Sequence, residues 1–128
     1  LHTCRLYTVT ASINRSRSAS ARRSVEFWAA ALGATPVRSD ESDDPYVALE
    51  GATSVAFEVQ AIDDEPRYHV DIETDDVVAE TARLRALGAT EVSRHDGWVV
   101  LRAPGGHLLC VVPVQSEPDV FAAGARTW

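Results

Sequence analysis

The heptad Ala-Leu-Gly-Ala-Thr-Pro-Val at residues 31–37 recurs at residues 86–92 as Ala-Leu-Gly-Ala-Thr-Glu-Val, with a single change. In both copies the glycine follows a segment whose apolar residues have helical spacing, and a strand-like segment comes after it. The distance between the copies is close to half of the 128-residue chain. The repeat therefore indicates that one structural unit is present twice, and such repeats are read before single elements are assigned.

The correspondence between the two halves continues beyond the heptads. Residues 46–49, Tyr-Val-Ala-Leu, match residues 98–101, Trp-Val-Val-Leu. Residues 56–59, Ala-Phe-Glu-Val, match residues 108–111, Leu-Leu-Cys-Val. These matches keep both their order and their strand-like type. Duplicated units usually face each other, so a ligand is expected at the seam between them.

Composition places the chain among globular proteins of one domain, since 45% of its 128 residues are hydrophobic. The net charge of −7 argues against nucleic acid as a partner, because a basic stripe would be expected there. No apolar run is long enough to span a membrane. Two cysteines do not form a disulfide framework. We therefore expect a cytoplasmic protein, and Leu1, which is not Met, need not be its natural start.

Periodicity predicts the order strand, helix and three strands in each half. In the first repeat, about 5–60, we expect a strand at 5–13, a helix from Ser20 or Ser24 to about Leu32, and strands at 35–38, 46–50 and 54–60. In the second, about 67–114, we expect a strand at 67–73, a helix opened by Thr74, Asp75 and Asp76 and ended by Gly88, and strands at 90–93, 98–102 and 107–112. The fold class is thus α+β, with one domain over 1–114 and a tail at 115–128 that forms a short helix.

The same patterns predict which side chains face the helices. Helical spacing gives buried stripes of Val25, Trp28, Ala29 and Leu32 in the first helix and of Val77, Val78, Thr81, Leu84 and Leu87 in the second. Strand alternation sorts the strand residues between two faces, of which the bulky apolar one is expected to meet a helix. Glu58, His69 and Cys110 fall on the opposite faces, so they are expected to point to the helix-free side of the sheet.

Three stretches in register with the duplication resemble a known family. They are Arg-Ser-Val-Glu-Phe-Trp at 23–28 ahead of Ala-Leu-Gly at 31–33, His-Val-Asp-Ile at 69–72, and Ala-Pro-Gly-Gly-His-Leu-Leu-Cys-Val-Val-Pro at 103–113. Over about residues 20–114 the chain resembles the vicinal oxygen chelate superfamily of glyoxalase I, bleomycin-resistance proteins and extradiol dioxygenases, and within it the small bacterial glyoxalase-like subgroup. The resemblance implies two βαβββ units that form a curled mixed sheet around a cavity, with helices outside. Chemistry does not follow from it, because this fold hosts many activities.

Metal-using members of that superfamily place one ligand on the first and one on the fourth strand of each unit. By this resemblance Glu58 matches the fourth-strand carboxylate of the first unit, and His69 matches the first-strand imidazole of the second. Cys110 stands where the second unit would carry its carboxylate. The first-strand imidazole of the first unit has no match, since subtraction from His69 leads to Asn14 and the neighbouring hydroxyl residues are no better.

A divalent metal ion, if one bound, would thus have Glu58, His69 and Cys110 as ligands, and thiolate suits zinc. A free thiol, however, titrates near about 8.5 and needs a positive neighbour to ionise, so Cys110 is interpreted as a small buried apolar residue. No metal or other cofactor is expected. His69 is then a cavity-wall histidine that pairs with a carboxylate such as Glu58, because an isolated buried charge is costly.

Three further residues are candidate ligand contacts. Asp71 either lines the mouth of the cavity or is solvated. Tyr46 and Trp98 occupy equivalent positions in the two repeats. They either form the walls of a site for a flat ligand or pack in a core or at a subunit contact.

These residues support hypotheses from different functional classes. In the first, the cavity binds a small aromatic or amphipathic organic molecule without a metal. In the alternative, the protein is a lyase or isomerase resembling glyoxalase, in which Glu58 and His69 carry acid–base or metal-assisted chemistry. Relatives of this fold commonly dimerise, so a homodimer is expected. In a third hypothesis assembly is the whole role, and the tail with Phe121 and Trp128 supplies the contact.

Overall fold

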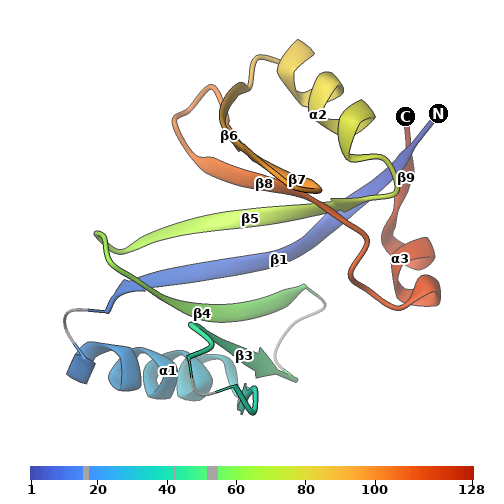
Figure 1. Cartoon of the computed structure of the whole chain (residues 1–128). Coiled ribbons are helices and arrows are strands. Elements are labelled where there is room, and N and C mark those ends of the chain that lie inside the picture. Colours follow the sequence, from blue (N-terminus) through green and yellow to red (C-terminus); the bar gives the residue numbers. More distant parts are fainter. Residues whose placement is uncertain (16–17, 42, 52–54) are drawn as a thin grey trace. The chain divides into compact units, whose positions relative to one another are not determined.

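The computed structural model describes residues 1–15, 18–41, 43–51 and 55–128. Three helices and nine strands follow one another in this part of the chain, which confirms the α+β class (Figure 1). They are β1 (Thr3–Asn14), α1 (Ser18–Leu32), β2 (Thr35–Arg38), β3 (Tyr46–Glu50), β4 (Ala56–Ile62), β5 (Arg67–Thr74), α2 (Val77–Ala86), β6 (Thr90–His95), β7 (Trp98–Arg102), β8 (Leu108–Pro113), α3 (Pro118–Gly124) and β9 (Arg126–Thr127). Helix α1 begins before the predicted Ser20 or Ser24. Residue 54, where the fourth strand was expected to start, lies outside the described residues.

The chain divides into two compact units, which are described separately. The α1 unit is Thr8–Tyr68, and the α2 unit is Leu1–Tyr7 together with His69–Trp128. The strand order is β2-β3-β4-β1 in the α1 unit and β6-β7-β8-β5 in the α2 unit. In each, the first strand runs parallel to the fourth, and the other neighbours are antiparallel. Both units are therefore βαβββ units of one topology, which confirms the duplication.

The repeated heptad forms the turn from helix to strand in each unit. Gly33 and Gly88 have φ angles of 65° and 111°, in the left-handed region that favours glycine. The residue after each glycine donates its backbone N–H back into the helix, from Ala34 to the Ala29 carbonyl at 2.9 Å and from Ala89 to the Leu84 carbonyl at 3.1 Å. The sequence is repeated because the same turn is needed twice.

Each unit has its own apolar core between its helix and its strands. The buried residues of the α1 unit are Ile13, Val25, Val47, Leu49 and Val59, with Trp28, Ala29 and Phe57 packed against them. Those of the α2 unit are Val99, Leu101, Leu109 and Val111, with Val70, Ile72, Val77 and Leu84 packed against them. The predicted apolar strand faces thus meet the helices, and the opposite faces carry polar residues together with apolar ones.

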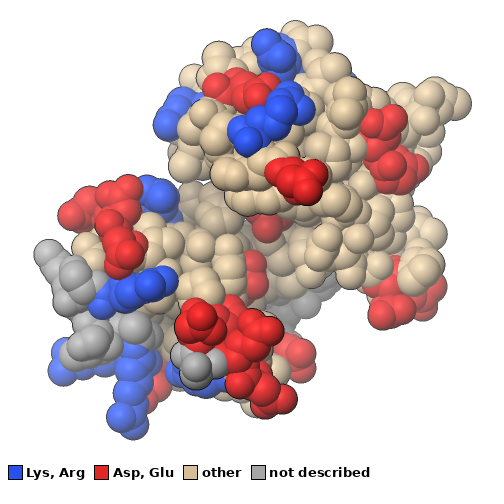
Figure 2. Space-filling view, in the orientation of Figure 1, with Lys and Arg blue, Asp and Glu red and all other residues tan. Residues whose placement is uncertain are grey.

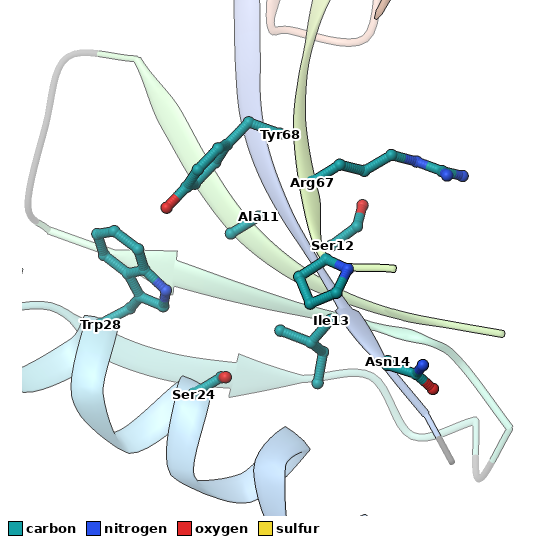
Figure 3. A pocket seen from close by; sticks show the side chains of 9 residues that line it. Ala11, Ser12, Ile13, Asn14, Ser24, Trp28, Arg67 and Tyr68 are labelled. Carbon is teal, nitrogen blue, oxygen red and sulfur yellow. The ribbon is translucent and has the colours of Figure 1, made fainter. Parts of the chain in front are cut away.

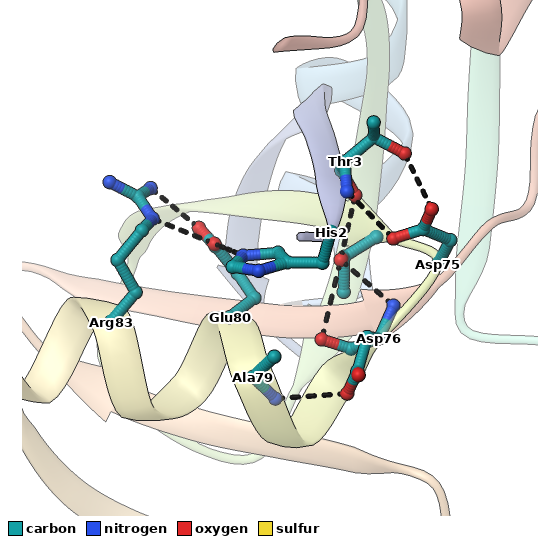
Figure 4. Close-up of polar contacts among 8 residues, drawn as sticks. His2, Thr3, Asp75, Asp76, Ala79, Glu80 and Arg83 are labelled. Carbon is teal, nitrogen blue, oxygen red and sulfur yellow. Dashed lines mark hydrogen bonds and ion pairs between the residues drawn. The ribbon is translucent and has the colours of Figure 1, made fainter. Parts of the chain in front are cut away.

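The predicted stripe of α2 is wrong at two positions. Val78 is 73% exposed and Leu87 is 66% exposed, whereas the Glu80 side chain is completely buried. The Glu80 carboxylate accepts two hydrogen bonds from Arg83, at 2.7 and 2.8 Å, and lies 2.6 Å from Nε2 of His2 (Figure 4). The buried side of α2 is therefore partly polar, and apolar spacing alone misplaces its centre.

The first turn of α2 is held by the acidic residues that the sequence predicted there. Asp76 caps the helix by accepting the backbone N–H of Ala79 at 2.9 Å. Asp75 accepts both the backbone N–H and the hydroxyl of Thr3, each at 2.7 Å (Figure 4). The helix is thereby fastened to the first residues of β1.

The tail folds onto its own chain. It forms the expected short helix, α3, and then β9, which pairs antiparallel with Thr3 and Cys4 of β1. The buried carboxylate of Glu73 accepts the backbone N–H groups of Gln115 and Ser116 at 2.8 and 2.9 Å, and the Ser116 hydroxyl at 2.7 Å. The start of the tail therefore supplies three donors to a buried carboxylate that also lies 3.4 Å from Nε of Arg5.

The surface carries charges of both signs. Figure 2 shows arginine side chains interspersed with acidic ones on the face seen. Exposed pairs such as Arg94 with Glu91 and Arg67 with Asp64, each at 2.8 Å, account for part of this pattern. Among the described residues, none of the helices combines the length and the apolar character needed to cross a membrane.

Candidate functional site

Three polar side chains gather on the helix-free face of the α2 unit. His69 and Asp71 come from β5 and Cys110 comes from β8, and their potential ligand atoms all lie within 4.8 Å of one another. The parallel ladder makes Asp71 the direct partner of Cys110, and His69 the partner of Leu108. All three are half-buried. Asp71 therefore belongs to this cluster and is not a solvated surface residue.

The electrostatics of the cluster are set by Cys110 and Asp71. Burial raises the pKa of the Cys110 thiol, and the charge and hydrogen bond of Asp71 raise it further, to about 12. The thiol is thus a neutral S–H group at physiological pH, and it donates to a carboxylate. Nε2 of His69 lies 3.6 Å from Oδ1 of Asp71. That distance is longer than a good hydrogen bond but suits an ion pair when the imidazole is protonated.

The corresponding face of the α1 unit carries hydroxyl and carboxylate groups. The Thr10 hydroxyl donates to Glu58 at 3.1 Å, and the Ser12 hydroxyl donates to the side-chain oxygen of Gln60 at 3.2 Å. The Gln60 amide donates in turn to the Tyr46 hydroxyl at 2.9 Å. Glu58 therefore accepts a hydrogen bond from Thr10, a residue of its own unit.

The ladder register decides which residues of the two units correspond. Thr10 lies opposite Glu58 as Asp71 lies opposite Cys110, and Thr8 lies opposite Ala56 as His69 lies opposite Leu108. The equivalent of His69 is therefore Thr8, whose hydroxyl is a far weaker metal ligand than an imidazole. Subtraction of sequence numbers, which led to Asn14, misses this because α1 has 15 residues whereas α2 has 10, so the offset between the two units is not constant.

The positions of Tyr46 and Trp98 are confirmed as equivalent. Tyr46 directly precedes Val47, which pairs with Val59 of β4, and Trp98 directly precedes Val99, which pairs with Val111 of β8. Both aromatic rings are at the surface. The Trp98 ring stacks on His95, with centroids 3.9 Å apart. Their role as walls for a ligand stays a prediction.

The structure thus brings together His69, Asp71 and Cys110, while Glu58 and Tyr46 belong to the other unit. The predicted convergence of Glu58 with His69 and Cys110 stays a prediction. Sequence reasoning missed the buried contact of His2 with Glu80 and a cavity beside α1. No spacing signal marks either of them, because each depends on how distant segments pack.

The donor set of the α2 cluster fits a metal ion in part. An imidazole, a carboxylate and a thiol at these separations are the ligand types of zinc sites that keep one open position. A metal would have to displace the thiol proton of Cys110, against the negative charge of Asp71 in a half-buried site. Without a metal ion, the cluster therefore offers a protonated thiol, an imidazole and a carboxylate for hydrogen bonding.

Two βαβββ units, each with polar groups on its helix-free face, define a glyoxalase-type fold. The family described as "Glyoxalase-like domain" matches residues 13–112. The chain belongs to this family, which confirms the resemblance to the vicinal oxygen chelate superfamily. Among proteins with a curated description, none matches the chain in sequence.

Some solved structures are similar to the chain at low sequence identity. A Bacillus subtilis YycE protein of unknown function, titled a putative glyoxalase/fosfomycin resistance protein, is 12% identical, with 87% of this chain and 90% of that chain covered and a TM-score of 0.33. The V278E mutant of glyoxalase I from Zea mays is 21% identical, with 84% and 45% covered and a TM-score of 0.30. A bleomycin resistance determinant encoded on the transposon Tn5 is 15% identical, with 84% and 97% covered and a TM-score of 0.30. The family assignment rests on the sequence match and not on these structures.

Proposed function

We propose that this chain is a binding protein that holds a small aromatic or amphipathic organic molecule against residues of its helix-free faces, without a metal ion. The observation that carries the proposal is the half-buried Cys110 thiol beside Asp71. Its pKa, raised to about 12, keeps the thiol protonated. A protonated thiol serves a ligand as a hydrogen-bonding and weakly apolar contact.

The residues around the cluster support an amphipathic ligand. Leu108 and Val112 lie two residues before and after Cys110 on β8, so they share its face, and apolar surface adjoins the polar groups. His69 adds a ring nitrogen that donates or accepts according to its tautomer. A ligand with a flat apolar body and a few oxygen or nitrogen atoms matches this mixture.

Ligand screening tests the proposal directly. The probes are flat aromatic compounds that carry hydroxyl or carbonyl groups, and the measurement is calorimetric titration of each compound that raises the melting temperature. We expect at least one compound whose affinity falls about tenfold or more in His69→Ala and in Cys110→Ala, which each remove a contact. Thr90→Ala, an exposed change on β6, serves as the control. Affinities that are equal in all variants would refute this placement of the ligand.

An enzymatic role is the second candidate, and the 3.6 Å approach of His69 to Asp71 favours it. A carboxylate beside an imidazole orients the ring, as proton-transfer catalysis requires. Glu58 would be a second proton-transferring group in a lyase or isomerase of this kind. Turnover of 2-oxoaldehyde–thiol adducts tests this role. A rate that is absent, or that persists in His69→Ala, would exclude it.

A further inference from the structure

A cavity of about 420 Å³ lies beside α1 in the α1 unit (Figure 3). Buried Ala11 and Ile13 of β1 form its apolar floor. Ser24 and Trp28 of α1 stand on one side, and Tyr68 at the start of β5 stands on another. The cavity is therefore on the helix-covered side of the sheet, whereas Glu58 lies on the other side of its strand.

Its two aromatic rings form a corner and do not cover each other. The Trp28 and Tyr68 ring centroids are 6.3 Å apart, with the ring planes at 86°. Trp28 also packs on Phe57 of the core, at 5.1 Å between ring centroids, and this contact holds the orientation of the indole ring. Tyr68 is 61% exposed. A flat molecule can thus contact both rings without displacing either of them.

Three hydrogen-bonding groups around this cavity have no protein partner among the described residues: the Trp28 indole N–H, the Ser24 hydroxyl and the Tyr68 hydroxyl. In Figure 3 the nitrogen edge of Trp28 faces into the cavity, on the side of Ile13 and Ser24. Elsewhere in the same unit the phenol of Tyr46 does have a partner, Gln60. Donors that converge on a cavity in this way are what fixes the orientation of a bound molecule.

We propose that this cavity is a second ligand site, which takes a flat aromatic carboxylate. Its volume lies in the range of small-molecule sites, about 300–1,000 Å³. The rings contact the aromatic body, and the Trp28 N–H and the Ser24 hydroxyl donate to the carboxylate. Arg67 at the rim already pairs with Asp64 at 2.8 Å, so the two donors and the rings define the site. The site uses none of the residues of the proposed function, so the two succeed or fail independently.

Titration of the full chain with 2-naphthoate, followed by the indole N–H signals of its three tryptophans in ¹H–¹⁵N NMR spectra, tests the proposal. The Trp28 signal, assigned with Trp28→Phe, is expected to shift saturably with a dissociation constant of about 1 mM or below. The signals of Trp98 and Trp128 are expected to stay in place. Cyclohexanecarboxylate, which lacks the flat ring, is expected to bind at least about tenfold more weakly.

Single substitutions distinguish binding in this cavity from nonspecific binding elsewhere on the chain. Ser24→Ala is expected to weaken binding about fivefold, the loss of one hydrogen bond, and Tyr68→Ala about tenfold. Ser39→Ala, an exposed change in the same unit, is the matched control, and Glu58→Gln tests independence from the helix-free face; both are expected to leave the affinity unchanged. Equal shifts of all three indole signals, a Trp28 shift without saturation, or an affinity indifferent to Ser24→Ala and Tyr68→Ala would each overturn the proposal.

Discussion

The chemistry of Cys110 follows from the residue that the strand register places opposite it. Asp71 is its ladder partner, and the two side chains share the helix-free face of β5 and β8. A cationic neighbour would have lowered the pKa of the thiol and prepared a metal ligand or a nucleophile. A carboxylate in a half-buried setting does the reverse, so Cys110 acts as a neutral group.

Alkylation of Cys110 is predicted to be slow. Since its pKa is raised to about 12, the reactive thiolate stays scarce through pH 8–9 and increases only as the pH approaches 12. At pH 8.5 iodoacetamide should modify Cys110 at least about a hundredfold more slowly than an ordinary free thiol. Asp71→Asn removes the negative charge, lowers this pKa and should accelerate the reaction.

Peptide mapping by mass spectrometry separates Cys110 from Cys4, the other free cysteine, and the urea-unfolded chain provides the reference rate. An ordinary rate in the folded wild-type chain, or no acceleration in Asp71→Asn, would show that the carboxylate does not control the thiol.

Alternation along the strands was enough to predict which face His69 and Cys110 occupy. The interpretation of Cys110 as a small buried apolar residue rested on the high pKa of a free thiol and not on alternation. The partnership of Cys110 with Asp71 could not be predicted, because alternation fixes faces and leaves the register between strands open. The sequence comparison led to Asn14, where the ladder places Thr8, because the two helices differ in length.

In helix α2, hydrogen-bond partners compensate the cost of burying the charge of Glu80. Burial raises the pKa of Glu80, but the hydrogen bonds from Arg83 and His2 outweigh it, so the pKa of Glu80 is lowered overall. Arg83 also covers the Trp128 ring, at 4.1 Å from its centroid. The cluster thus joins the start of the chain, α2 and the C-terminal residue.

Glu80→Ala is predicted to lower the free energy of unfolding by about 3 kcal/mol, since it leaves the partly buried Arg83 without its partner. Glu91→Ala is the matched control, because Glu91 forms the same i,i+3 pair with Arg94 in an exposed position. This control should leave the stability nearly unchanged. Urea denaturation of both variants at pH 7 makes the comparison. Equal losses would mean that burial does not set the strength of the Glu80 cluster.

The two heptad glycines give a prediction about the turns. Gly33→Ala should cost about 1 kcal/mol, because a side chain is strained at its φ of 65° although space is open there. Gly88→Ala should cost more, because its Cβ would also lie 3.2 Å from Cγ of Pro104. Thermal unfolding of the two variants checks this order. A smaller loss for Gly88→Ala would contradict it.

Element type was more predictable than element boundaries or helix faces. The glycine signals placed both helix ends, and strand alternation found eight of the strands that the structure describes, whereas β9 (Arg126–Thr127) is too short to produce a pattern. The prediction of a buried apolar stripe on α2 was wrong at Val78 and Leu87, which are exposed. Glu80 is buried instead, because His2 and Arg83 pair with its carboxylate. Spacing rules count apolar residues and cannot anticipate a buried charge that distant residues satisfy.

For the chain as a whole, the internal repeat was the decisive signal. It predicted two βαβββ units, and both units have that topology. The repeat carries no information about chemistry, because the residues that differ between the halves, Thr8 and His69 or Thr10 and Asp71, are those on the helix-free faces. The expected homodimer stays a prediction.

Elemental analysis of protein purified without chelators, and without added metal, tests most directly whether this family member binds its ligand without a metal. With the Cys110 thiol protonated beside Asp71 and Thr8 in place of a second imidazole, zinc, nickel, manganese and iron should each be far below one ion per chain. Near-stoichiometric metal in the wild-type chain that is lost in Cys110→Ala or His69→Ala would contradict the account.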